Sequence, residues 1–260
     1  MRDEAGRYPT NRPPIPKGPF GIDSQRCITH SIFADYRSSR RKMIVFDVDG
    51  TLIGGESADW ASFGAAFEEV AGFVLNENFF ESIEEVTAQA IVHQALGTIA
   101  PEERRSKERA VCQGYLRRLR HAYETNTSSF TAIEGAPDLL RDLKGKGIPI
   151  AIATGDWRET TLFKLRAARI PFDDVPLVTS SEFYSRADII AAAVAKAGCQ
   201  LHEALYIGDG LWDLRASRKL GIPFIGVGYR IEKLRNAGAA HILPNLSPIE
   251  FWRVRNTISV

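Results

Sequence analysis

Short apolar runs rich in β-branched residues alternate with segments of helical periodicity along most of the chain. The runs that predict strands are residues 43–46, 148–153, 177–179, 204–207 and 223–227, with a last short one at 242–243. The segments that predict helices are residues 137–144, 157–168, 187–197, 211–220 and 231–237. Gly147, Gly198 and Gly221 follow three of these helices, where a left-handed residue commonly ends a helix. The alternation predicts an α/β fold, in which a doubly wound parallel sheet has helices on both faces.

Residues 57–130 interrupt this alternation, because they contain no strand signal. Apolar side chains recur there at helical spacing, at Trp60, Phe63, Phe67, Val70 and Val74, then loosely at Ile83, Val86, Ala90 and Ile91, and again at Val111, Tyr115, Leu119 and Ala122. We expect an all-helical domain inserted into a core made of residues 43–56 and 131–260. The aromatic residues of the first set are interpreted as the interior of that domain.

The first 42 residues differ in composition from the rest of the chain. They hold five prolines and nine Lys or Arg against four Asp or Glu, a net charge of +5, whereas residues 43–260 carry −4. This composition predicts a flexible basic arm. The arm has no apolar stretch of the signal-peptide kind. Two readings stay open: a genuine extension, or translation that starts at Met43.

Overall composition narrows the range of partners. The chain has 33 Lys or Arg and 32 Asp or Glu, so its net charge of +1 gives no reason to expect a nucleic-acid or membrane partner. Cys27, Cys112 and Cys199 lie far apart, without the spacing of a disulfide framework or a zinc site. We expect a reduced, cytoplasmic protein, and the sequence leaves its oligomeric state open.

The string DVDGT, which begins at Asp47, carries the strongest chemical signal. Asp47 and Asp49 directly follow the first predicted strand, and side chains two residues apart on an extended chain point the same way. Both carboxylates therefore face the carboxyl edge of the sheet, where ligands bind in open parallel sheets. A calcium loop of the EF-hand type would need Gly and Glu where this chain has Leu52 and Ala58, so that alternative fails.

Four strings, in order, resemble the motifs of the haloacid dehalogenase-like superfamily. The first is DVDGT, and the second is the apolar string IAIAT, which ends in Thr154. The third is a cation ahead of a helix, for which Arg186 is the candidate, and the fourth is GDGLWD, with Asp209 and Asp213. The resemblance covers residues 43–245. It implies a Rossmann-like core with a helical cap inserted as in phosphoglycolate-phosphatase-like members.

The resemblance also implies a chemistry, that of a Mg²⁺-dependent phosphatase acting on a small phosphorylated metabolite. Asp47 is the implied nucleophile, which forms an aspartyl-phosphate, and Asp49 is the implied general acid and base. Thr154 would hold a phosphate oxygen, and Arg186 would offset the charge of the nucleophile and the phosphate. The implied Mg²⁺ ligands are Asp47, Asp49 through its backbone carbonyl, Asp209 and, in a supporting role, Asp213.

Several alternatives remain open at this point. A haloacid dehalogenase is disfavoured, because that branch lacks the second aspartate of the first motif, here Asp49. A phosphomutase of the β-phosphoglucomutase type shares all the motifs. A phosphonatase would need a lysine in the cap, where Lys107 is available, and a non-catalytic binding module would be expected to have lost some of the aspartates. In purely structural interpretations, Thr154 caps a helix and Arg186 is a solvated surface charge.

Overall fold

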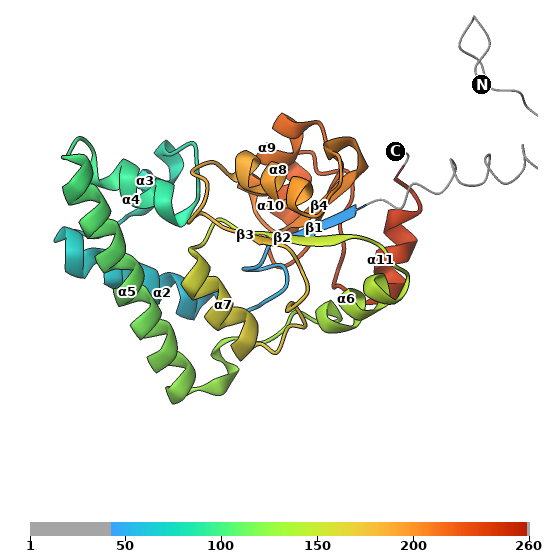
Figure 1. Cartoon of the computed structure of the whole chain (residues 1–260), viewed down its shortest axis with the longest axis horizontal. Helices are drawn as coiled ribbons and strands as arrows, with labels where there is room; N and C mark the ends of the chain where they lie inside the picture. Colours follow the sequence, from blue (N-terminus) through green and yellow to red (C-terminus); the bar gives the residue numbers. More distant parts are fainter. Residues whose placement is uncertain (1–42, 259–260) are drawn as a thin grey trace, which may run out of the picture. The chain divides into compact units, whose positions relative to one another are not determined.

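A parallel sheet of five strands forms the centre of the described structure. The computed structural model describes residues 43–258 (Figure 1), and the predicted basic arm lies outside this range. The strands are β1 (Met43–Phe46), β2 (Ile150–Ala153), β3 (Leu177–Val178), β4 (Ala204–Gly208) and β5 (Phe224–Gly226). They are ordered β3-β2-β1-β4-β5, and every neighbouring pair is parallel. This topology confirms the predicted doubly wound α/β fold.

Each strand coincides with a predicted apolar run to within two residues. Gly147, Gly198 and Gly221 have φ of 63°, 74° and 66°, so they end their helices in the left-handed conformation as predicted. The predicted strand at residues 242–243 is wrong, because in the described structure Ile242 forms only an isolated bridge with Gly226.

Helices cover both faces of this sheet (Figure 1). One face carries α8 (Arg186–Lys196), α9 (Leu211–Leu220) and α10 (Ile231–Asn236). The other face carries α6 (Ala136–Gly145), α7 (Arg158–Ala167) and α11 (Pro248–Arg255). The 3-10 turn η2 (Leu201–Glu203) leads into β4, and α11 was not predicted. None of the described helices is both long enough and apolar enough to span a membrane.

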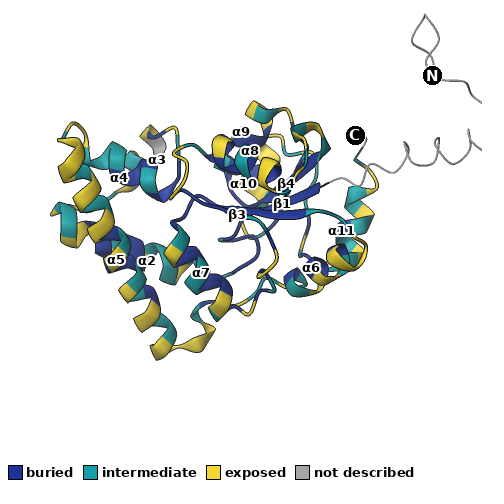
Figure 2. Cartoon of the chain, viewed as in Figure 1, coloured by how far each residue is buried: buried dark blue, intermediate teal, exposed yellow. Residues whose placement is uncertain are grey.

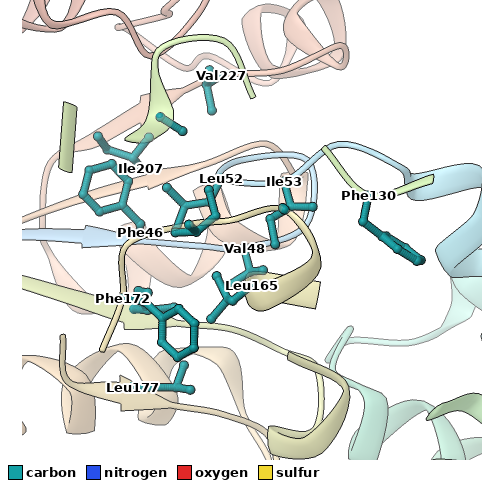
Figure 3. Close-up of a cluster of buried hydrophobic side chains, with 14 of the residues drawn as sticks. Phe46, Val48, Leu52, Ile53, Phe130, Leu165, Phe172, Leu177, Ile207 and Val227 are labelled. Atoms are coloured by element: carbon teal, nitrogen blue, oxygen red, sulfur yellow. The ribbon is translucent and has the colours of Figure 1, made fainter. Parts of the chain in front are cut away.

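Neighbouring residues of β1 point to opposite faces of the sheet. Ile44 and Phe46 belong to the apolar cluster that contains α6, α7 and α11, whereas Met43 and Val45 belong to the cluster of α8, α9 and α10. Figure 3 shows Phe46 in the first of these clusters, together with Ile207 of β4. The strands are buried throughout (Figure 2). Burial on both faces explains why the strands are continuous apolar runs and do not alternate with polar residues.

Residues 56–125, the helical segment, follow β1 and contain no strand. They form α2 (Glu56–Ala71), α3 (Glu77–Ser82), α4 (Ala88–Leu96) and α5 (Pro101–Thr125), and the short turn η1 (Thr127–Ser129) comes next. α2 and α5 pack along each other, and α5 also contacts α7 of the core. The chain leaves and re-enters the core through two adjacent stretches, since Gly54 N donates to Thr131 O at 2.8 Å.

Two of the predicted sets of helically spaced residues include residues that lie outside any helix. α2 ends at Ala71, so Val74 lies beyond the helix and is 63% exposed. Ile83 and Val86 lie between α3 and α4, outside either helix. Gly72 explains the first end, because it adopts φ of 82° and its N–H caps the carbonyl of Glu68.

Gly55, where α2 begins, provides a test of how tightly the two connections pack. It has φ of 109°, and a Cβ atom there would lie 1.9 Å from Ser129 O. We expect Gly55→Ala to lower the free energy of unfolding by about 2 kcal/mol or more, through backbone strain and this clash. Gly64→Ala is the matched control, because a Cβ at that position of α2 meets nothing within 4 Å. The control should be neutral or stabilise by up to about 1 kcal/mol. Urea denaturation measures both, and equal effects would contradict the packing described.

Candidate active site

Three buried carboxylates meet at the carboxyl edge of the sheet. Asp47 directly follows β1, Asp209 follows β4, and Asp213 lies in the first turn of α9. One oxygen from each lies within 4.8 Å of the others. The three residues are 3%, 0% and 0% exposed. β1 and β4 are parallel neighbours and end at the same edge, so two motifs far apart in the sequence meet there.

Asp209 keeps one oxygen without a partner. Its Oδ1 is buried and accepts no hydrogen bond from the described residues, whereas its Oδ2 accepts from Arg230. Burial raises the pKa of Asp47 and Asp209 well above the usual range, and the nearby charge of Asp213 raises both further. The three carboxylates offer only oxygen ligands, and Asp209 Oδ1 is buried without a partner among the described residues. Such a set of ligands fits a hard divalent cation such as Mg²⁺.

Asp213 differs, because the protein already satisfies its oxygens. Oδ1 accepts from the Tyr206 hydroxyl at 2.9 Å, and Oδ2 accepts from Gly210 N at 3.0 Å. Arg186 Nη1 lies 3.2 Å from the same Oδ1. These bonds fix the orientation of the Asp213 carboxylate.

Arg186 is the first residue of α8, and its guanidinium faces the cluster. Nη1 donates to Asp47 Oδ1 at 2.8 Å, and Nη2 donates to Val86 O at 3.1 Å. The residue is only 6% exposed, so the reading of Arg186 as a solvated surface charge is wrong. Gly155 allows this approach, because a Cβ there would lie 2.3 Å from Nη2.

Asp49 stands apart from the three clustered carboxylates. Its Oδ1 lies 2.6 Å from Nζ of Lys164 on α7. Burial raises the pKa of Asp49 to about 8, although the positive charge of Lys164 acts in the opposite direction. A carboxyl group with that pKa carries a proton at neutral pH, which suits a general acid.

Lys164 joins the core to the helical segment. It is fully buried, and its Nζ lies 2.8 Å from Asp59 of α2 and 2.9 Å from Asp156 of the core. Tyr115 of α5 donates its hydroxyl to Asp59 and lies 3.3 Å from Nζ. Burial lowers the pKa of Lys164, but the surrounding carboxylates outweigh it, so the pKa is raised and the amine stays charged.

Sequence reasoning missed Lys164, although a signal was present. Thr160, Thr161, Lys164 and Leu165 follow helical spacing and form the buried side of α7. A lysine on such a face is either paired or functional, because an unpaired buried charge is too costly. Asp156, two residues after Thr154, offered the matching negative charge.

Arg230 was also missed. It lies in the loop after β5, where it donates to Asp209 Oδ2 and lies 3.7 Å from Glu56. Its guanidinium lies 5.0 Å from the centre of the Trp212 ring. No pattern in the sequence marks this residue, because its partners Asp209 and Glu56 lie far from it along the chain.

A small cavity of about 80 Å³ lies over the carboxylates. The predicted site residues that line it are Asp47, Asp49, Thr154 and Arg186. The helical segment closes it, with Trp60, Phe63, Ile91 and Tyr115 among its contributions. Trp60 and Phe63 were expected to form only the interior of the helical domain. Their rings do contact each other there, but both residues also line this cavity.

Comparison with known proteins agrees with the site. The profile of the haloacid dehalogenase-like hydrolases matches residues 44–227. The chain belongs to this family of hydrolases. Hexitol phosphatase A from Escherichia coli (strain K12) is 29% identical over 143 residues, and the match covers 52% of this chain and 58% of that protein. The chain therefore aligns with little more than half of this relative.

Solved structures share the fold of this haloacid dehalogenase-like hydrolase. A hydrolase from Pseudomonas syringae superposes with a TM-score of 0.66 at 23% identity, over 84% of this chain and 100% of the other. β-Phosphoglucomutase from Clostridium difficile gives 0.65 at 15% identity, over 83% and 96%. At these identities the likeness establishes the fold alone.

The three ion pairs of Lys164 give a prediction on stability. Lys164→Met leaves the buried Asp156 and the half-buried Asp49 and Asp59 without their shared cation, so we expect a loss of about 3–5 kcal/mol at pH 8. In the wild type the charge of Lys164 lowers the pKa of Asp49 and of Asp156, so without it both carboxyl groups bind protons at a higher pH than in the wild type, and the folded variant regains stability relative to the wild type as the pH falls. The deficit should therefore shrink at pH 5.

Urea denaturation at the two pH values measures this deficit. Lys144→Met is the control, because Lys144 lies 3.7 Å from the exposed Asp174 and its loss should cost under about 1 kcal/mol. A Lys164→Met deficit as small as that of the control, or one independent of pH, would contradict the account.

Proposed function

We propose that this hydrolase is a Mg²⁺-dependent phosphatase that cleaves a small phosphorylated metabolite through an aspartyl-phosphate on Asp47. The observation that carries the proposal is that the two aspartates of the first motif have different surroundings. Asp47 lies with Asp209 and Asp213 beside Arg186, whereas Asp49 is held 2.6 Å from Lys164. This arrangement supports attack and metal binding by the first carboxylate and proton transfer by the second.

The helical segment would act as a cap. We propose residues 57–130 as the cap and residues 43–56 and 131–260 as the core. The support is the cavity of about 80 Å³, whose walls come from both parts, and the two adjacent connections at Gly54 and Thr131. Aromatic side chains over the carboxylates exclude water and so favour transfer to Asp47 over uncontrolled hydrolysis.

In the first step Asp47 attacks phosphorus, and the bond from phosphorus to the ester oxygen breaks. Asp49 gives its proton to the departing oxygen, which leaves as an alcohol. In the second step Asp49 takes a proton from a water molecule that attacks the phosphorus. This releases inorganic phosphate, restores the Asp47 carboxylate and returns the proton to Asp49.

Two further groups would hold the phosphoryl group in place. Arg186 fixes the orientation of Asp47 through its bond to Oδ1 and brings a permanent positive charge to the same place. Thr154 lines the cavity, and its hydroxyl also accepts from Asp156 N at 3.2 Å. Its own proton is then available to a phosphate oxygen.

A Mg²⁺ ion would be held by Asp47, Asp209 and the backbone carbonyl of Asp49, with Asp213 in support. When bound, the ion supplies positive charge that offsets the carboxylates and the phosphate oxygens. The free Oδ1 of Asp209 supports this assignment.

Two of the alternatives, the phosphonatase and the dehalogenase, fit less well. Lys107, the only lysine available for a phosphonatase cap, does not line the cavity and lies 3.9 Å from Glu103. The acid Asp49 has no use in a dehalogenase, because a halide leaves without a proton. The phosphomutase shares every residue named here, so product analysis has to separate it. The partial likeness to hexitol phosphatase A makes phosphorylated sugars and polyols the first substrates to test.

Asp47→Asn tests the nucleophile. The substitution removes the attacking oxygen with almost no change in shape, so turnover should fall at least about a hundredfold while the fold is retained. Released inorganic phosphate is measured with purified protein and Mg²⁺ over a panel of sugar and polyol phosphates, and circular dichroism checks the fold. Asp138→Asn is the control, because Asp138 is exposed on α6 and pairs with Arg141.

Two results would contradict the proposal. One is an Asp47→Asn protein that keeps more than about a tenth of the wild-type rate, which a lost nucleophile does not allow. The other is a wild-type protein that isomerises a sugar phosphate without releasing phosphate, which would indicate the phosphomutase.

A further inference from the structure

A second, larger cavity adjoins the one over the carboxylates. Its volume is about 640 Å³, and it shares Trp60, Val86, Trp212 and Arg230 with the smaller cavity. The smaller cavity, at about 80 Å³, has only about an eighth of this volume. The remainder of a substrate held there would therefore extend past these shared residues into the larger cavity.

The lining of this larger cavity combines apolar and basic side chains. Leu211, Leu214, Arg215 and Arg218 lie on one face of α9, at the spacing of one helical stripe. Lys233 of α10 completes the basic side, and the helical segment supplies the apolar side with Trp60, Phe80 and Ile83. No carboxylate is among the described residues that line this cavity.

Most of these positive charges have no acidic partner. Among the described residues, Arg215 and Lys233 form no ion pair. Arg218 donates only to the backbone carbonyls of Ala237 and Gly238, at 2.7 and 3.0 Å. Arg230 alone is neutralised, by Asp209 and Glu56. The other three cations are exposed, and of the nearby carboxylates Glu84 and Glu85 share a separate adjoining pocket with Arg215 without forming an ion pair with it. Several cations without an ion pair on one side of a cavity favour an anion there.

The direction of α9 sets how far such an anion would lie from the reaction. The helix begins at the catalytic edge, with Asp213 in its first turn, and the basic stripe continues to Arg218. Five residues at 1.5 Å each correspond to about 7 Å along the axis. Arg215 lies two residues, or about 3 Å along the axis, beyond Asp213, so an anion held by Arg215, Arg218 and Lys233 would lie about 3–8 Å further along α9 than the carboxylate cluster.

We propose that this larger cavity, the anion pocket, binds a second anionic group of the substrate. The proposal rests on the phosphatase function above and narrows its substrate class. The substrate is a phosphomonoester that carries another phosphate or a carboxylate several bonds away from the scissile phosphate. Its carbon skeleton packs against Trp60 and Trp212. Sugar bisphosphates and phosphorylated sugar acids belong to this class.

Binding to a non-hydrolysing protein tests the pocket separately from turnover. In the Asp47→Asn background with Mg²⁺, calorimetry compares fructose 1,6-bisphosphate with fructose 1-phosphate, and 6-phosphogluconate with glucose 6-phosphate. At least one ligand with the second anion should bind about tenfold more tightly than its partner. The first pair reports a second phosphate and the second pair a carboxylate.

Arg215→Ala combined with Lys233→Ala should reduce that ratio to about one, through weaker binding of the doubly anionic ligand only. Lys219→Ala with Arg235→Ala is the matched control, since both residues are exposed on the same two helices and neither lines the pocket. The control should keep the preference. Equal affinities within both pairs, or a preference that survives the Arg215 and Lys233 substitutions, would overturn the proposal. Failure of the phosphatase function appears separately, as the absence of phosphate release by the wild-type protein.

Discussion

The concentration of buried negative charge at the carboxyl edge of the sheet is the constraint on which the rest of the structure depends. Parallel strands bring Asp47, Asp49 and Asp209 to one edge, and desolvation penalises each of their charges. Such a site is stable only if each carboxylate is protonated, paired with a cation or bound to a metal. The structure uses a different solution for each aspartate.

Arg186 and Lys164 divide the two aspartates of the first motif between them. Arg186 has a guanidinium that cannot lose its proton in a protein, and it contacts Asp47. Lys164 contacts Asp49 and also reaches Asp59 of the helical segment. The second contact makes the position of the helical segment part of the charge balance. In the phosphatase we propose, the same ammonium group of Lys164 therefore holds the general acid Asp49 and fixes the cap through Asp59.

Elements and site residues whose role depends on nearby residues in the chain could be predicted from the sequence. Those whose role depends on packing between distant segments were harder to predict. The alternation of strands and helices, and the pairs around Asp47 and Asp209, could be predicted because strand ends and turns are encoded within a few residues. Arg230 could not, since its partners Asp209 and Glu56 lie more than 20 positions away in the chain. Lys164 left a local signal in the buried side of α7 and the nearby Asp156, but its contacts with Asp49 and Asp59 depend on packing over more than 100 positions. Helix ends such as that before Val74 were misjudged because apolar spacing continues past the glycine that stops the helix.

Binding of Mg²⁺ to the metal-free protein tests the central claim of charge compensation most directly. Because the pKa values of Asp47 and Asp209 are raised, protons compete with the metal for these oxygens as the pH falls. The account predicts that Mg²⁺ raises the melting temperature by several degrees at pH 8, by much less at pH 5, and hardly at all in Asp209→Asn. No stabilisation at pH 8, or equal stabilisation of Asp209→Asn, would contradict it.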